Sequence, residues 1–354
     1  MEPKFDLPIT SSPVPSSSFS QLTSVSSGEA EDIDRRCRER FEKYVPINAQ
    51  DDVVRLLTAF MDHLPKDGSV RLMQDIIALD GDSKLRQLRN HLVDALLKPI
   101  QASGGKTPAP TPSACGDNQA QNIESLVVLT SMNPSRNEQS KLKKDCLKRD
   151  GYRCQATGLW DDQSVESGHI IPDDHKASTT TEIAHILPFA LGKFDGDKDI
   201  EIENKARIWQ CLYRYFPGLH KVLSPETINT PANAITLDQY IHHQFGSLNV
   251  IFNETDDAHV YEIIKHNQTN HIAFSFLPSN GLIALRCEDS SVLMPSPFLL
   301  SVHARIGKIL KVSGLKDRLE KMMYTLFLPS EVNPSGSTDL GTIVFNRLLI
   351  LTDV

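Results

Sequence analysis

Apolar residues in the first third of the chain recur at the spacing of amphipathic helices. Two aspartates, Asp51 and Asp52, stand where the first of these helices would begin, as helix start signals do. Apolar positions follow the three-to-four-residue period in three sets, over 53–64, 70–79 and 85–97. Helices this close together predict a small helical bundle over 28–103. The bundle contains no chemical constellation, so we expect a scaffold or a module that binds a partner protein.

Segments without such a pattern surround the bundle. Residues 1–27 are rich in Ser and Pro, and they carry too little apolar surface to order themselves, so we expect a disordered tail. Residues 104–122 begin Gly-Gly-Lys-Thr-Pro-Ala-Pro and are typical of an extended linker. This change of composition predicts a domain boundary, with a second domain over 123–327. Residues 328–354 form a turn-rich tail whose apolar run, 343–351, is a candidate last strand.

Short apolar runs characterise the second domain. Two similar strings, Ser167-Gly-His169-Ile-Ile-Pro172 and Ile183-Ala-His185-Ile-Leu-Pro188, each predict a strand that enters a proline turn. Residues 195–224 predict a polar turn and a helix whose aromatic side chains belong to the core. Four later runs predict strands, followed by a final helix from about Pro297 to Met322; the strands are 250–252, 260–264, 272–276 and 282–285. Together with the bundle, these elements predict an α+β protein.

Composition favours an intracellular protein that does not cross a membrane. No stretch approaches the roughly 20 apolar residues that span a bilayer. The first residues, Met1 to Ile9, carry acid and proline where a signal peptide would carry bases and then an apolar run. The six cysteines are scattered without close pairs, as is typical of a reducing compartment. These features do not separate cytoplasm from nucleus.

Charge sets a condition for any nucleic-acid partner. The formal net charge of −8 is the wrong sign for coating nucleic acid non-specifically, so binding would need a local basic surface. Six basic side chains lie within thirteen residues, at Lys141, Lys143, Lys144, Lys148, Arg149 and Arg153. Charge alone is compatible with two interpretations of this basic run, a solvated helix face and a phosphate-binding surface. The continuation, with a helix stop at Gly151 and a turn at Thr157-Gly158, favours phosphate binding.

Three side chains further along could carry hydrolytic chemistry. His185 ends a predicted strand, and Asn233 stands nine positions ahead of His242, which lies on a predicted helix. Metal-assisted phosphodiester hydrolysis needs a base for water, a divalent ion to neutralise developing charge, and a fixed orientation of the base. Histidine suits the first task because its ordinary pKa lies near neutral pH. An asparagine amide suits the third, because it can tie down a loop.

In their order and spacing, these residues resemble the fungal branch of the HNH endonuclease family. The resemblance covers roughly 140–320. Its motifs are Arg149-Asp-Gly-Tyr-Arg-Cys154, Thr157-Gly158, Ala184-His185-Ile-Leu-Pro-Phe189, Asn233, His242, Phe245 and Leu293–Leu300. It implies a ββα-metal core, here with a helical insertion, C-terminal strands and a C-terminal helix. It also implies that His185 is the general base, that His242 is a metal ligand and that Asn233 orients the loop of the base.

The resemblance further implies a metal-dependent endonuclease that acts on nucleic acid, DNA rather than RNA. Mg²⁺ or Mn²⁺ is the expected ion, with Zn²⁺ as an alternative. Many HNH nucleases carry an Asp or His metal ligand immediately before the base histidine, where this chain has Ala184. That departure leaves a second interpretation open, in which an inactive HNH-like domain serves as a nucleic-acid or protein interaction module.

Two carboxylates are candidates for the missing metal ligand. Asp238 lies four residues before His242 and so on the same helix face, although a helix N-cap is its favoured role. Glu182 lies on the strand of His185, and regular alternation would direct its side chain to the opposite face. His243 lies about 100° around the helix from His242, so we do not expect it to be a second ligand. His169 rivals His185 as the base, but Asn233 and His242 follow His185 in register.

Overall fold

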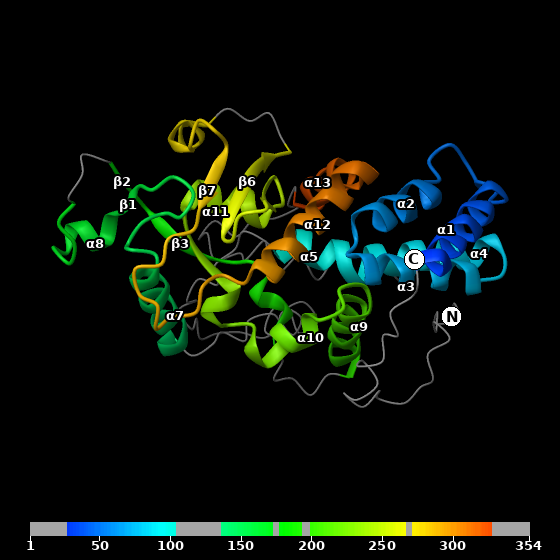
Figure 1. Cartoon of the computed structure of the whole chain (residues 1–354), viewed down its shortest axis with the longest axis horizontal. Coiled ribbons are helices and arrows are strands. Elements are labelled where there is room, and N and C mark those ends of the chain that lie inside the picture. Colours follow the sequence, from blue (N-terminus) through cyan, green and yellow to red (C-terminus); the bar gives the residue numbers. More distant parts are fainter. Residues whose placement is uncertain (1–26, 104–135, 173–176, 193–198, 267–270, 328–354) are drawn as a thin grey trace, which may run out of the picture.

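The computed structural model describes residues 27–103, 136–172, 177–192, 199–266 and 271–327. The predicted linker and C-terminal tail, with its candidate strand, lie outside the described residues, as does the predicted N-terminal tail apart from Ser27. The rest is a mixture of helices and small sheets, which confirms the α+β class. Figure 1 shows the N-terminal helices at one end of the molecule, with β1, β2 and α8 at the other.

The predicted N-terminal helices are confirmed. The second of them begins at Val53, directly after its N-cap Asp52. The side chain of Asp51 accepts a hydrogen bond from the backbone N–H of Val53 at 3.1 Å. A π-helical turn, Val93–Leu97, joins the last two. The helices are α1 (Ser27–Glu42), α2 (Val53–His63), α3 (Lys66–Ala78), α4 (Asp82–Leu92) and α5 (Lys98–Ser103).

The remaining elements follow in a mixed order. The helices are α7 (Arg136–Arg149), α8 (Asp162–Glu166), α9 (Asp199–Tyr215), α10 (Leu219–Val222), α11 (Gln239–Gly246), α12 (Pro297–Ser313) and α13 (Leu315–Phe327). The strands are β1 (Trp160–Asp161), β2 (Ser178–Thr179), β3 (Thr181–His185), β4 (Ala234–Asp238), β5 (Val250–Glu254), β6 (Val260–Lys265) and β7 (Leu282–Ala284). Short 3₁₀ turns cover Phe189–Leu191, Pro225–Thr227, Pro231–Asn233 and Ile272–Phe276.

The strands form three small sheets. β3 and β4 are antiparallel, in a register that runs from Thr181 opposite Asp238 to His185 opposite Ala234. β5, β6 and β7 form an antiparallel sheet in that order, whereas β1 and β2 are a short parallel pair. This register places His185 and the start of β4 at one end of the two-stranded sheet, whereas α11 begins directly after β4 at the other end.

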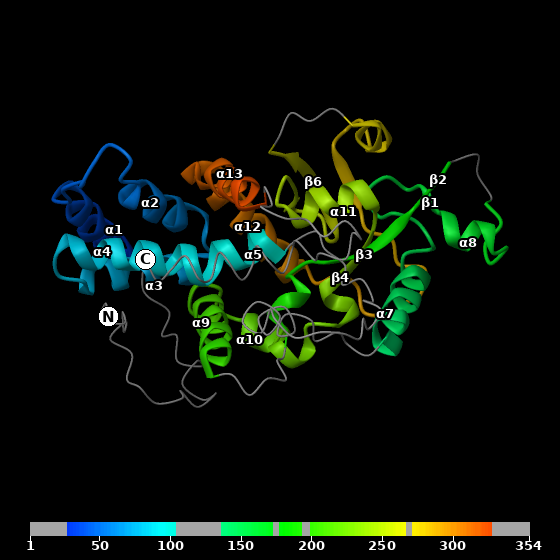
Figure 2. The same cartoon turned by 180° about the vertical axis from the view of Figure 1, so that it is seen from behind.

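Helices cover both faces of the β3–β4 sheet (Figure 2). Side chains alternate between the two faces along a strand, so β3 can pack against α7 on one face and α11 on the other. Ile183 packs with Leu142 and Cys146 of α7 in a small cluster, whereas Ala184 belongs to the main core. Glu182 shares the face of Ala184, and α11 packs on β3 there. This strand–strand–helix unit carries the predicted site.

Three predicted elements were wrong in detail. Residues 167–172 form no strand, because the chain turns at Gly168, whose φ is +68°. Residues 272–276 form a 3₁₀ turn that begins where the His271 ring accepts a bond from the N–H of Ala273. The final helix is divided into α12 and α13 at Gly314, which has a left-handed φ of +68°. Apolar runs are common to strands and buried turns, so their composition did not separate the two.

The N-terminal helices share one buried core with the rest of the chain. Gly68 allows α3 to lie against α9, because an added Cβ would collide with the carbonyl oxygen of Tyr215. Asp75 of α3 pairs with Arg214 of α9, and Asp52 pairs with Arg318 of α13. As predicted, aromatic side chains of the α9 segment belong to this core; the buried ones are Trp209, Tyr215 and Phe216. Within the described ranges, no helix is both long and apolar enough to cross a bilayer.

Candidate active site

His185 is held at the end of β3 by an asparagine that the sequence did not single out. Its Nε2 lies 3.1 Å from Oδ1 of Asn229, in the loop that leads to β4. An amide oxygen only accepts, so Nε2 donates and Nδ1 is left as the unprotonated ring nitrogen. The imidazole is half-buried, and its ring centroid lies 5.4 Å from that of Phe189. One ring nitrogen of His185 can therefore accept a proton, while the other fixes the ring.

Burial keeps this imidazole neutral. The pKa of His185 is lowered to about 4, and desolvation is the largest cause. The bond to Asn229 raises this pKa in part, and the nearby His242 adds to the lowering. At neutral pH the ring is therefore in the form that can accept a proton.

Asn233 ties together the two turns that flank this site. Its side chain is fully buried, with Oδ1 accepting from the N–H of Leu187 at 2.9 Å. Its Nδ2 donates to the carbonyl oxygens of Leu187 and Ile228, each at 2.9 Å. Leu187 lies two residues after His185, whereas Ile228 precedes Asn229. One amide thus positions both His185 and the asparagine that holds its ring.

His242 and Glu182 form a pair between α11 and β3. Nδ1 of His242 lies 2.6 Å from Oε2 of Glu182. The pair is covered unequally, since the His242 side chain is 4% exposed and that of Glu182 is 30% exposed. The bond to His242 is the main cause that lowers the pKa of Glu182, so the carboxylate is ionised at neutral pH. Glu182 and Ala184 share a face of β3, so Glu182 brings to that face the carboxylate that Ala184 lacks.

The pair is a partial match to a divalent-ion site. No group of three or more His, Cys, Asp and Glu side chains that could hold a metal occurs among the described residues. Mg²⁺ typically retains several waters and binds through one or two carboxylates together with phosphate oxygens of the substrate. One ionised oxygen and one imidazole nitrogen, 2.6 Å apart, fit an ion whose remaining ligands are water and phosphate. They do not fit a fully protein-enclosed metal site.

Asp238 is occupied as a helix cap, the role favoured for it over a metal ligand. Its Oδ1 accepts from the N–H groups of Tyr240 and Ile241, each at 3.0 Å. Its Oδ2 accepts from the hydroxyl of Thr179 at 2.6 Å. Both carboxylate oxygens therefore have hydrogen-bond partners, and Asp238 is a helix cap and not a metal ligand.

The basic side chains of the predicted phosphate-binding surface have different environments. Lys141 and Lys144 are exposed on α7, and Lys143 bonds to Gln163 at 3.1 Å. Lys148 pairs with Asp289 at 2.6 Å. The guanidinium carbon of Arg153 lies 3.3 Å from the centroid of the Trp160 ring. These side chains remain candidates for a nucleic-acid surface, although Lys148 is already paired with an aspartate.

Arg149 was wrongly assigned to that surface. Its side chain is fully buried and pairs with Asp150, at 2.6 Å from Nε to Oδ1. The guanidinium also donates to the carbonyl oxygens of Pro231, Leu293 and Ala234. Arg149 therefore joins α7 to β4 and to the segment before α12. A run of basic residues in the sequence shows how many charges are present, but it does not show which of these side chains is buried.

The rival histidines lie outside the site. His169 is exposed and bonds to the hydroxyl of Tyr152 at 2.8 Å, and His243 is exposed on α11. The residue that sequence reasoning missed is Asn229. The only signal for it was a second asparagine four positions before Asn233.

Comparison with known proteins identifies the segment that carries this site. The model of the HNH endonuclease family matches residues 154–253, which include β3, β4 and α11. No curated protein and no solved structure gave a match.

Proposed function

We propose, on the premise that residues 154–253 belong to the HNH endonuclease family, that this protein is a divalent-metal-dependent endonuclease. It would hydrolyse phosphodiester bonds of nucleic acid, DNA rather than RNA. The unit of β3, β4 and α11 would be its ββα-metal core. The observation that carries the proposal is His185, a neutral imidazole fixed through Nε2 by Asn229 at the end of the strand that also bears Glu182.

The side chains of the site divide the work of hydrolysis. Nδ1 of His185 accepts the proton of the attacking water. Asn233 holds the turns on either side, so that the imidazole keeps one orientation. Glu182 and His242 would hold the ion. When bound, Mg²⁺ or Mn²⁺, or Zn²⁺ as an alternative, neutralises the charge that develops on the phosphate and on the leaving oxygen.

Plasmid nicking tests the proposal directly. The full chain is incubated with supercoiled plasmid, with Mg²⁺, with Mn²⁺ or with EDTA, beside His185→Ala and the control His169→Ala. We expect metal-dependent nicking that falls about 10²-fold or more in His185→Ala, because general-base catalysis supplies roughly that factor. His169→Ala should nick like the wild type. Nicking that is absent, or equal in the two variants, overturns the proposal. A parallel RNA substrate tests the preference for DNA.

One observation favours the second candidate, an inactive HNH-like interaction module. The His242 side chain is only 4% exposed, and Ala184 offers no ligand. Calorimetric titration with Mn²⁺ separates the two functions. Heat that is present in the wild type and lost in His242→Ala supports the endonuclease, whereas a wild type without metal-binding heat supports the inactive module.

A further inference from the structure

Arg149, the last residue of α7, and Asp150, which follows it, bond to the edge of β4 that faces away from β3. Among the described strands, β4 pairs with β3 alone. Nη2 of Arg149 donates to the carbonyl oxygen of Ala234 at 2.9 Å, and Oδ2 of Asp150 accepts from the N–H of Thr236 at 3.0 Å. Ala234 and Thr236 are two residues apart, so these backbone groups lie on the same edge of the strand. The two side chains therefore occupy the place of a neighbouring strand.

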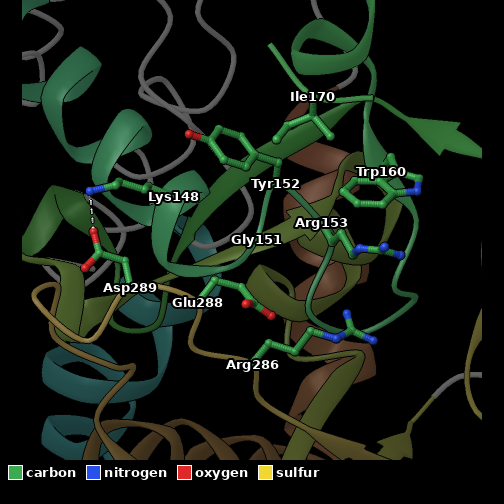
Figure 3. A pocket seen from close by; sticks show the side chains of 9 residues that line it. All are labelled: Lys148, Gly151, Tyr152, Arg153, Trp160, Ile170, Arg286, Glu288 and Asp289. Atoms are coloured by element: carbon green, nitrogen blue, oxygen red, sulfur yellow. Dashed lines mark ion pairs between the residues drawn. The ribbon is translucent and has the colours of Figure 1, made fainter. Parts of the chain in front are cut away.

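The end of α7 is itself fixed by contacts that do not involve these side chains. The carbonyl oxygen of Arg149 accepts from the N–H of Glu288 at 2.7 Å, and Lys148 pairs with Asp289 at 2.6 Å. Figure 3 shows this ion pair, together with Gly151 in the turn that follows the helix. The guanidinium of Arg149 therefore extends from a backbone whose position is already set.

The same guanidinium holds both ends of the 3₁₀ turn that carries Asn233. Nη1 donates to the carbonyl oxygen of Pro231 at 2.8 Å, and Nη2 donates to that of Ala234 at 2.9 Å. Pro231 begins the turn, and Ala234 directly follows its last residue. The planar guanidinium offers donors in a rigid fork, whereas a lysine ammonium is a single charge on a flexible stem. Arg149 therefore sets the position of the turn to which Asn233 belongs.

The Asn233 side chain connects this turn to His185. It bonds to the N–H and the carbonyl oxygen of Leu187 and to the carbonyl oxygen of Ile228, each at 2.9 Å. Leu187 follows His185 by two residues. Ile228 directly precedes Asn229, whose Oδ1 lies 3.1 Å from Nε2 of His185. Hydrogen bonds and short stretches of backbone therefore join the guanidinium on α7 to the imidazole at the end of β3.

The burial of the Arg149–Asp150 pair favours a role in position over a role in stability. Both side chains are 0% exposed. Removing two charges from water is costly, so a buried ion pair contributes little net stability compared with apolar side chains in both positions. Such a pair can be retained because it specifies one arrangement of the groups around it. Here that arrangement includes the backbone on either side of Asn233.

We propose that Arg149, paired with Asp150, is a positioning residue for the general base His185 and acts through the turn at Asn233. The inference rests on the proposed function, in which His185 takes the proton of the attacking water. It gives a residue of α7, outside the matched segment 154–253, a part in the chemistry at the end of β3. A small displacement is enough, because misplacing a reacting group by about 1 Å can lower the rate about 10²-fold.

Arg149→Lys tests the inference, because it keeps a cation beside Asp150 and removes the fork. The control is Arg214→Lys, since Arg214 bonds to Asp75 through two nitrogens and joins α9 to α3. Plasmid nicking by the full chain gives kcat and KM, and calorimetry gives the Kd for Mn²⁺. We expect kcat to fall about 10- to 100-fold in Arg149→Lys, with KM and Kd unchanged, because only the base is displaced. Arg214→Lys should keep the kcat of the wild type.

Urea curves of both variants are measured first, so that activities are compared per folded molecule. If Arg149→Lys is unfolded in buffer, the comparison is repeated in trimethylamine N-oxide, which favours the folded state. A variant that does not fold there either assigns Arg149 to stability alone and overturns the inference. Equal kcat values in Arg149→Lys and Arg214→Lys also overturn it.

A double-variant cycle distinguishes positioning from an independent effect. Asn229→Ala removes the bond to Nε2 of His185 through which Arg149 is proposed to act. Arg149→Lys should therefore lower kcat by a much smaller factor in the Asn229→Ala background than in the wild type. Factors that simply multiply in the double variant would show two independent effects and would exclude the proposed path.

Histidine NMR follows the same contact without any activity. In a chain with isotope-labelled histidine, the proton on Nε2 of His185 is bonded to Asn229 and should exchange slowly with solvent. Its resonance is assigned by its loss in His185→Ala. We expect this resonance in the wild type and in Arg214→Lys, and its loss or faster exchange in Arg149→Lys. An unchanged resonance in Arg149→Lys counts against the inference.

The result is separable from the proposed activity. A chain whose His185 resonance depends on Arg149, but which does not nick plasmid, overturns the activity and leaves the role of Arg149 in holding His185 standing. A chain that nicks plasmid, and whose kcat and His185 resonance do not depend on Arg149, overturns this inference alone.

Discussion

Nδ1 of His242 and Oε2 of Glu182 lie 2.6 Å apart, and they join the helix to the strand of the proposed core. The contact gives Glu182 a partner that strand alternation alone did not reveal, because α11 packs on the same face of β3. It also makes Glu182 the only described carboxylate in direct contact with His242. A proton shared between these two atoms is what a divalent ion would displace, since metal ligands bind in their deprotonated form.

Glu182→Gln should therefore weaken metal binding. The amide keeps the size of the side chain but loses the charge, so we expect the affinity for Mn²⁺ and the rate of nicking to fall about 10- to 100-fold. Calorimetry and plasmid nicking measure the two effects. Glu166→Gln, at an exposed position on α8, should change neither. Unaltered Mn²⁺ affinity in Glu182→Gln would remove Glu182 from the site.

The lowered pKa of His185 predicts an unusual pH dependence. Protonation of Nδ1 abolishes the base, and its pKa in the folded protein is about 4, below the ordinary value. The acid limb of kcat/KM should therefore appear near pH 4, and activity should persist where an ordinary histidine is already protonated. An acid limb near pH 6.5 would show that His185 is not the titrating base.

Asn229 should act as a positioning residue through that pKa. Asn229→Asp places a carboxylate at Nε2, where it favours the charged imidazolium, so the acid limb should move to higher pH. Asn280→Asp makes the same change of charge in an exposed turn and should leave the profile in place. A fall in kcat in Asn229→Asp without any shift of the acid limb would indicate a role in folding alone.

Asn233 should contribute to stability as well as to activity. Asn233→Ala leaves three buried backbone groups, two of them on Leu187 and one on Ile228, without their partner. We expect the free energy of unfolding to fall by about 2–5 kcal/mol, because each buried unsatisfied group costs about 1–3 kcal/mol before local rearrangement. Urea denaturation measures it. Asn48→Ala, on the surface, should change the free energy of unfolding by about 0.5 kcal/mol or less.

Basic residues of the α7 segment should separate into two classes. Arg149→Met leaves Asp150 buried without its cation and should lower the free energy of unfolding by about 3–5 kcal/mol. The double variant Lys141→Gln/Lys144→Gln should keep the stability of the wild type and reduce the salt slope of DNA binding by up to about two. Urea denaturation and anisotropy titrations measure these effects. Lys43→Gln/Lys66→Gln is the control for charge, and an equal slope in both double variants would exclude α7 from the interface.

The sequence alone determined the elements that carry the site. Helix-period patterns located α2 to α4, and an apolar run before a proline turn located β3. Strand ends, turns and helix starts have local signals, and the order of His185, Asn233 and His242 indicated their relation through the resemblance to the HNH endonuclease family. The role of Asp238 as a helix N-cap could also be predicted from the sequence, since a cap depends on the few residues that follow it.

Tertiary structure decided which of these residues meet. Strand alternation assigns Glu182 to a face, but only the packing of α11 on that face brings it to His242. Asn229 reaches His185 across 44 positions of sequence, and no local pattern encodes such a contact. Arg149 belonged to a basic run, yet its side chain is buried against three carbonyl groups from two distant segments. Periodicity describes one element at a time, whereas burial and hydrogen bonding depend on elements that become neighbours only when the chain folds.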